Sequence, residues 1–185
     1  FKGSKVVDKQ GKPLVCFHGT KVTFNSFRPL SHFGTIDASN NFVGCFDSED
    51  SKRKDNITPV YLSIKNPLEI KDEDNYAPDL GFDMYYQGFI TYDELLDVYD
   101  NTRYGKNLND EIQNIISKFN FDLDKKRPNF ATFLDHAGYK INTKKFISIF
   151  KNKGYDGMVY TNTSEDYGSI SWIIFDSNQV WPIFK

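Results

Sequence analysis

The stretch LVCFHGT at residues 14–20 decides the fold, together with its counterpart SISWIIFD at residues 169–176. Each is a short apolar run rich in β-branched and aromatic residues, which is typical of a buried strand. The first run closes with His18-Gly19-Thr20, and the second carries Ser171 within its apolar residues. We expect these two ends of the chain to fold together, with their polar residues in one site.

The segments around these two runs predict an α+β chain. Thr35 has the residue type of a helix N-cap, and Ala38 and Phe42 then fall on one helical face. Residues 60–65 alternate between apolar and polar types and lie between two prolines, which indicates a strand. Strand patterns return after Gly154, at residues 157–160, 171–175 and 180–184.

The middle of the chain, from about residue 72 to residue 152, is mostly helical in pattern. Thr91, Asn109 and Thr143 can each cap a helix, and Gly154 stands where the last helix should stop. The strands lie at both ends and do not alternate with the helices. We therefore expect a single α+β domain over residues 1–185 with a helical insertion at about 72–152.

Composition excludes two classes of protein. Hydrophobic residues make up 39% of the chain and charged residues 26%, unlike a disordered tail or a membrane protein. No apolar run approaches the roughly 18 residues of a membrane span. The formal net charge of −2 gives no broad attraction for nucleic acid. Because the chain begins at Phe1 and not at Met, we expect it to be excised from a longer protein.

Cysteine and histidine usage gives no metal site. The two cysteines, Cys16 and Cys45, are too few for a disulfide scaffold, which favours a reducing compartment. Cys16 and His18 fall on the same side of a strand, but no further ligand has suitable spacing, and His136 lies far away in the helical middle. We expect no metal cofactor.

Three motifs in order carry a family resemblance: His18-Gly19-Thr20, then His32-Phe33-Gly34-Thr35, then the run from Ser169 to Asp176. They resemble the ADP-ribosyltransferases of the diphtheria-toxin and poly(ADP-ribose) polymerase branch. Residues 59–68 and 154–160 are similar to the ADP-ribosyltransferase domain of phage and plasmid polyvalent proteins and of some bacterial toxins and effectors. The resemblance implies split antiparallel sheets around an NAD crevice.

The resemblance also implies which residues bind NAD. It places a ribose hydroxyl on His18 and the nicotinamide carboxamide on Gly19 and Ser39, with Thr20 completing the strand-end motif. A glycine after the histidine lets a ligand approach the backbone, whose N–H and C=O groups can pair with an amide.

Two aromatic side chains are expected to sandwich the nicotinamide ring. The resemblance places Phe42 on one face of the ring, and Ser39 and Phe42 share a helical face at this spacing. His32 stands where the family usually has a stacking tyrosine, and its flat imidazole can stack as well.

The main departure from the family is Ser171, which stands where the transferase glutamate normally lies. Its hydroxyl can bond to the ribose but brings no negative charge, so chain elongation is not expected. Gln179 can contribute to catalysis from the strand end. Glu165 and Asp166, in the preceding loop, are expected to recognise the acceptor first and to supply a displaced carboxylate second.

These features lead to one expected function and two alternatives. We expect a mono-ADP-ribosyltransferase that uses NAD and modifies a macromolecule, with a host protein favoured over nucleic acid and no membrane partner. It would act in the cytoplasm, as a domain of a secreted or phage-injected protein. The alternatives are a non-catalytic NAD-binding module on a degenerate scaffold, which the missing glutamate would permit, and an NAD glycohydrolase, in which water is the acceptor.

Overall fold

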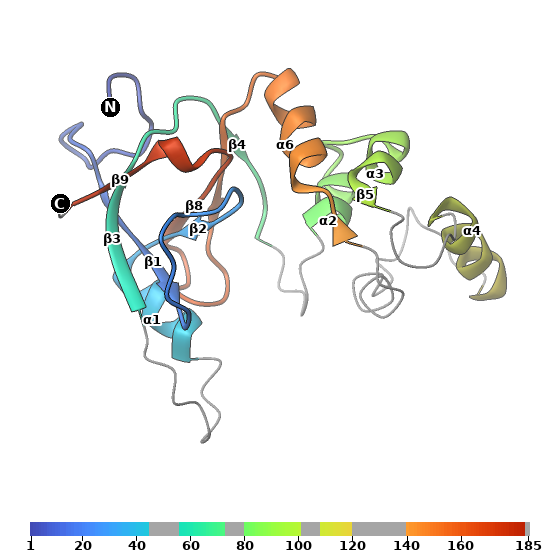
Figure 1. The fold of residues 1–185 in the computed structure, drawn as a ribbon, viewed down its shortest axis with the longest axis horizontal. Helices are drawn as coiled ribbons and strands as arrows, with labels where there is room; N and C mark the ends of the chain where they lie inside the picture. Colours follow the sequence, from blue (N-terminus) through green and yellow to red (C-terminus); the bar gives the residue numbers. More distant parts are fainter. Residues whose placement is uncertain (45–55, 73–79, 101–107, 120–139, 184–185) are drawn as a thin grey trace. The chain divides into compact units, whose positions relative to one another are not determined.

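The computed structural model describes residues 1–44, 56–72, 80–100, 108–119 and 140–183 (Figure 1). The chain divides into two compact units. The first unit joins residues 1–74 to residues 150–185, so that the two ends of the chain form one body. The second unit spans residues 75–149, within the region that the sequence pattern marks as a helical insertion.

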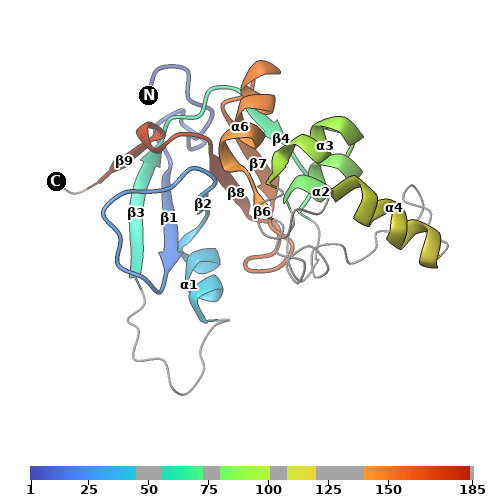
Figure 2. The ribbon, with the colours of Figure 1, turned by 45° about the vertical axis from the view of Figure 1, so that its right-hand side comes forward.

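The first unit contains two small sheets. The three-stranded sheet has the order β1 (Val15–Thr20), β3 (Asn56–Leu62) and β9 (Val180–Pro182), all antiparallel, and Figure 2 shows these strands side by side. The four-stranded sheet has the order β2 (His32–Phe33), β8 (Ile170–Ile174), β7 (Gly157–Thr161) and β4 (Pro67–Glu69). The expected α+β class with split sheets is therefore confirmed.

One strand differs from the antiparallel expectation. β4 pairs with β7 in parallel, with Leu68 opposite Met158, whereas β7 and β2 both run antiparallel to β8. A parallel pair needs a long crossover connection, and more than eighty residues separate β4 from β7 in the chain. The sequence pattern of residues 60–65 also missed the true start of β3, which begins at Asn56 because it pairs with Thr20 of β1.

An apolar core joins the two sheets. Its buried members come from the N-terminal segment, from β1, β2, β3 and β8, and from the residues just after β3: Val6, Cys16, Phe33, Val60, Leu62, Ile64, Trp172 and Ile174. Alternate residues of each strand point to this core, as the period-two pattern requires. Burial raises the pKa of the Cys16 thiol to about 12, so this cysteine packs as a small apolar residue.

Helix α1 (Ile36–Gly44) packs directly on β1. Thr35 caps it as predicted, since its hydroxyl accepts the N–H of Ala38 at 3.0 Å. A Cβ on Gly19 would lie 2.5 Å from the carbonyl oxygen of Ser39 and 2.9 Å from a methyl group of Val43. Only glycine lets the helix approach the strand this closely.

The second unit is built mainly from helices. Its elements are α2 (Leu80–Tyr86), α3 (Tyr92–Val98), α4 (Leu108–Phe119), α6 (Thr143–Asn152) and the antiparallel pair β5 (Tyr99–Asp100) and β6 (Lys140–Ile141); the last residues of α6 belong to the first unit. Thr91 and Glu94 form the expected capping box of α3.

The ends of α6 correct one cap and support another expectation. Asn142, and not Thr143, caps the helix, because its side-chain oxygen accepts the N–H of Lys145 at 3.1 Å. Gly154 follows the helix with φ of 93°, the left-handed conformation that ends a helix at glycine.

Candidate functional site

His18, at the end of β1, connects β1 to β2. Its Nδ1 lies 2.7 Å from the carbonyl oxygen of His32. A carbonyl only accepts, so Nδ1 carries the proton, and Nε2 is the ring nitrogen left to face a ligand. The imidazole packs against Phe24, Phe27 and Phe33 at ring-centre distances of 5.7, 5.4 and 5.3 Å. The aromatic contacts therefore fix the plane of the ring.

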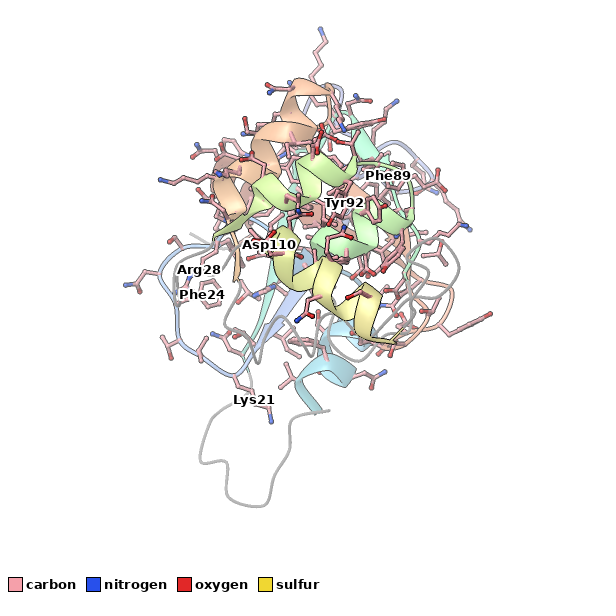
Figure 3. All side chains as sticks on the ribbon, turned by 90° about the vertical axis from the view of Figure 1, so that its right-hand side faces the viewer. Lys21, Phe24, Arg28, Phe89, Tyr92 and Asp110 are labelled. Carbon is pink, nitrogen blue, oxygen red and sulfur yellow. The ribbon has the colours of Figure 1, made fainter. Side chains whose placement is uncertain are left out.

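Two of these phenylalanines come from the loop between β1 and β2. Phe24 and Phe27 also contact each other edge to face, with ring centres 4.9 Å apart. Figure 3 labels Phe24 on this loop, with Lys21 and Arg28 before and after it along the chain. The loop thus places apolar rings beside His18 and carries two basic residues.

His32, on β2, bonds to the late part of the chain. Its Nδ1 lies 2.9 Å from the hydroxyl of Tyr160 on β7. Burial raises the pKa of Tyr160 above its ordinary value, and the charge of Asp72 adds to this, so the phenol stays protonated and can donate to the imidazole. The strand β2 itself pairs with β8, where His32 lies opposite Ile173.

The ring of His32 is neutral at pH 7. Protein atoms around its bonded side remove solvation and, together with nearby His18, lower its pKa to about 4, while the charge of Asp72 acts in the opposite direction. Another part of the residue stays exposed. A neutral, partly exposed ring can stack on a positively charged nicotinamide without repelling it.

Ser171 lies on β8 at the centre of this group and is only 3% exposed. Tyr160 is its register partner on β7, and the side-chain N–H of Asn162 lies 3.4 Å from its hydroxyl oxygen. Gly34 approaches from the other side, because a Cβ there would lie 2.8 Å from the same oxygen. The polar groups that surround Ser171 in this way are neutral.

Asn162 organises the loop between β7 and β8, and it is 2% exposed. Its side-chain oxygen accepts the backbone N–H groups of Ser164, Glu165 and Asp166 at 3.0, 2.9 and 3.2 Å. Its backbone closes the loop by a bond to the carbonyl of Ser169. One buried amide therefore holds the loop that the sequence suggests for acceptor recognition.

Side chains outside this loop hold it at both ends. The hydroxyl of Thr35 donates to the Asp166 carboxylate at 2.5 Å, and Asn41 donates to the carbonyl of Glu165. At the other end, Thr163 donates to Asp72, its N–H at 2.8 Å and its hydroxyl at 3.1 Å. The loop is therefore tied to α1 and to the segment after β4.

The remaining predicted NAD residues lie around α1 and the end of β1. Ser39 is 5% exposed and Phe42 is 44% exposed. The helical face that they share is therefore buried at Ser39 and exposed to solvent at Phe42. The hydroxyl of Thr20 accepts the N–H of Val22 at 3.2 Å. Gly19 has a structural reason to be glycine, the close approach of α1, beside any role toward a ligand.

Gln179, which the sequence suggests for catalysis, follows the other end of β8. Its side-chain oxygen accepts the N–H groups of Phe175 and Asp176 at 2.9 and 2.8 Å. Its amide nitrogen donates to the carbonyl oxygens of Asp156 and Ser63 at 2.6 and 3.3 Å. Both of its polar atoms are thus occupied by backbone groups, which gives Gln179 a structural role.

A cavity of about 670 Å³ opens beside this group of residues, at the ends of β4, β7 and β8. Its lining comes from these three strands and the segments that follow β4 and β7: Glu69, Ile70, Lys71, Asp72, Val159, Tyr160, Thr161, Thr163, Ile170 and Trp172. The volume suits a small ligand or an extended side chain.

No metal centre is found in the described part of the chain, where no three His, Cys, Asp or Glu side chains converge. Cys45 and His136, which the sequence analysis considered as ligands, lie outside the described residues.

Sequence reasoning missed three residues of the site: Tyr160, Asn162 and Asp72. Tyr160 is the last residue of the segment 154–160, whose resemblance to the family could have indicated it. Asn162 and Asp72 had no local signal, since asparagine and aspartate are common after strands. Their positions depend on pairings between distant segments.

Comparison with known proteins identifies one family. The family model described as ADP-ribosyltransferase in polyvalent proteins matches residues 8–184, nearly the whole chain. Neither a curated protein nor a solved structure matches the chain. Among the described residues, no helix has both the length and the apolar character needed to cross a membrane.

Proposed function

The chain belongs to the ADP-ribosyltransferases of polyvalent proteins, and from this premise we propose that it is a mono-ADP-ribosyltransferase. Enzymes of this class use NAD as substrate. In the proposed reaction, the bond between the nicotinamide nitrogen and C1′ of the ribose breaks, and nicotinamide leaves neutral with the electron pair. A nucleophile of a macromolecular acceptor then bonds to C1′ and loses its proton.

The observation that carries the proposal is the contact between the two ends of the chain. His18 of β1 bonds to His32 of β2, and His32 bonds to Tyr160 beside Ser171. These are the residues that the resemblance assigns to NAD, apart from Tyr160. Their convergence within one unit is what a shared NAD site requires.

Each residue of this group has a proposed role. Nε2 of His18 accepts a ribose hydroxyl, since its Nδ1 is already bonded. The neutral ring of His32 and the open ring of Phe42 enclose the nicotinamide, and Ser171 bonds to the ribose. Holding the ribose and the ring in one orientation lowers the entropic part of the barrier.

The loop between β1 and β2 is proposed to hold the diphosphate. Lys21 and Arg28 lie on this loop, close in sequence to the phenylalanines that pack on His18 (Figure 3). Basic side chains on the loop that packs against His18 would suit the two phosphate groups of NAD.

The acceptor is proposed to be a protein of a host cell, modified in the cytoplasm. The loop at residues 162–168 would recognise it, because this loop leads directly into Ser171 and is held in one conformation by Asn162. A preformed loop is suited to recognition, since little entropy is lost when the partner binds.

One observation favours a second candidate function. Ser171 brings no negative charge to the place where the family has a glutamate, and the groups around its hydroxyl are neutral. A site of this kind could bind NAD without cleaving it, as a non-catalytic module. NAD hydrolysis, with water as acceptor, would use the same residues as transfer.

The test is the release of nicotinamide from isotope-labelled NAD, with host lysate proteins as acceptors. Transfer predicts nicotinamide release together with labelled protein, and both should disappear in His18→Ala. Nicotinamide release with free ADP-ribose as the other product would indicate a glycohydrolase. Tight NAD binding without turnover would indicate the binding module, and absence of binding would contradict all three.

A further inference from the structure

The residues that the proposed function places on NAD include no negatively charged group. When nicotinamide leaves, positive charge builds on the ribose, as it does in glycoside hydrolysis. A carboxylate near this charge stabilises the transition state. Ser171 is neutral, so another residue must supply the charge if the protein is a transferase.

Asp72 lies at the edge of the four-stranded sheet, beyond the end of β4. The N–H of Ile70 donates to the carbonyl of Val159 at 2.9 Å, so the chain stays beside β7 after β4 ends. Two residues later, Oδ2 of Asp72 accepts both the N–H and the hydroxyl of Thr163. No described residue bonds to its Oδ1.

The register of the sheet places Asp72 on the same side as the site. Leu68 lies opposite Met158, and alternate residues of adjacent strands share a face. Met158 and Tyr160 therefore share a face with Leu68, and the same alternation continues to Asp72. Ser171 is opposite Tyr160 on the next strand, so it lies on this face as well.

Two further observations connect Asp72 to the reacting region. Asp72 and Tyr160 both belong to the lining of the cavity where β4 and β7 end, so they lie at the same edge of the sheet. The charge of Asp72 also acts on Tyr160 and on His32, where it raises the pKa of each. The carboxylate therefore lies within electrostatic range of the groups that the proposed function places on NAD.

We propose that Asp72 is a catalytic carboxylate of this site and supplies the negative charge that Ser171 does not. Thr163 holds Oδ2, and Oδ1 faces the ribose, where it stabilises the developing positive charge. The inference rests on the proposed function and adds a residue to it.

Three other carboxylates are the natural rivals. The charge of Glu165 also raises the pKa of Tyr160, but less than the charge of Asp72 does. Asp166 accepts the hydroxyl of Thr35 at the start of α1 and does not line the cavity. Glu69 lines the same cavity, but it is exposed and alternates to the opposite face from Ile70 and Asp72. Glu69 is the matched control for a test of Asp72, and Asp166, which belongs to the proposed acceptor loop, is measured beside it as a rival.

The experiment measures nicotinamide release and NAD affinity for the wild type and for Asp72→Asn, Asp166→Asn and Glu69→Gln. Asp72→Asn should lower kcat by about 100-fold, because one electrostatic contact to the transition state is lost. Its Kd for NAD, by calorimetry, should stay within about threefold, because the charge acts on the transition state and not on the bound substrate. The control Glu69→Gln should keep kcat within about threefold.

A second pair of variants separates charge from loop anchoring. Thr163→Val removes the hydroxyl bond and keeps the carboxylate, so it should lower kcat far less than Asp72→Asn does. If it slows the reaction as much as Asp72→Asn, Asp72 is an anchor and the inference is wrong. Should Asp72→Asn fail to fold, Asp72→Ser can still accept the N–H of Thr163, and it should show the same loss of kcat.

The result also distinguishes this inference from the proposed function. A wild type that releases no nicotinamide overturns the proposed function, and Asp72 as a catalytic residue with it. An active wild type in which Asp72→Asn matches Glu69→Gln overturns the role of Asp72 alone. An active wild type in which only Asp166→Asn is slow assigns the charge to Asp166 and likewise overturns the inference.

Discussion

The two ends of strand β8 differ in how their polar groups are used. Where the strand begins, Ser171 touches Asn162 and Gly34 and lies beside Tyr160, whose hydroxyl reaches His32. Where the strand ends, Gln179 bonds to four backbone groups of three chain segments, and Asp176 caps the short helix at Ser177–Gln179.

This difference teaches which residues are available for chemistry. At the end of β8, the side-chain bonds are directed to the protein's own backbone, so they stabilise the fold. At the start of β8, His18 and His32 each use Nδ1 within the protein, and Asp72 uses only Oδ2. Polar atoms that remain there can serve a substrate. The two ends of one strand therefore have separate roles, and substitutions should separate them.

The largest effect is expected for His18→Ala. The substitution removes the proposed ribose contact, and nicotinamide release should fall on the order of 100-fold or more in kcat/KM. The measurement is the rate of release from labelled NAD, with Gln179→Ala as the matched control from the other end of the sheet. An equal rate in His18→Ala and the wild type would contradict a catalytic role for the residues around the start of β8.

Gln179→Ala should affect stability and leave NAD binding unchanged. The loss of its bonds to the ends of β3 and β8 and to the start of β7 should lower the free energy of unfolding by about 1–3 kcal/mol. Urea denaturation measures this loss, and Asn178→Ala, an exposed neighbour, is the control. If the fold is intact and the Kd for NAD rises more than about tenfold, Gln179 contributes to NAD binding.

Gly19→Ala tests the close packing of α1 on β1. The new Cβ would lie 2.5 Å from the carbonyl oxygen of Ser39, so the helix or the strand must shift. We expect a loss of about 1–3 kcal/mol in stability. Gly44→Ala in the same helix meets no atom within 4 Å and should be close to neutral or slightly stabilising. Equal melting temperatures for both variants would show that the strand and helix adjust freely.

The smallest effect is a pH dependence that comes from His32. Its pKa in the folded chain, about 4, lies below the ordinary 6.5, so the unfolded chain takes up the proton first as the pH falls. The stability that depends on His32 is complete above pH 6.5 and is lost as the pH falls toward 4. The wild type should therefore lose more stability than His32→Gln between about pH 7 and about pH 4.5. Identical losses in both proteins would contradict a buried, neutral ring nitrogen.

Local signals predicted much of the fold. The capping residues Thr35 and Thr91, the stop at Gly154 and the strand before His18 depend on neighbours in sequence, and the structure has them all. The pattern could not reveal that β4 runs parallel to β7, because that pairing joins segments about ninety residues apart.

The site shows the same limit. The resemblance pointed to His18, His32 and Ser171, which the structure brings together. It could not show that the side chain of Gln179 forms its hydrogen bonds with backbone groups, since these belong to three segments that meet only in the fold. Asn162 and Asp72 were missed for the same reason, because their partners are reached through sheet pairing and not through sequence spacing.

The most direct measurement is an NMR titration of the labelled protein with an NAD analogue whose bond between nicotinamide and ribose cannot be cleaved. The account predicts that backbone signals of His18, Gly19, His32 and Ser171 shift together with one Kd, while those of Phe175 to Gln179 stay in place. Shifts confined to the end of β8, or no shifts at a saturating concentration, would contradict it.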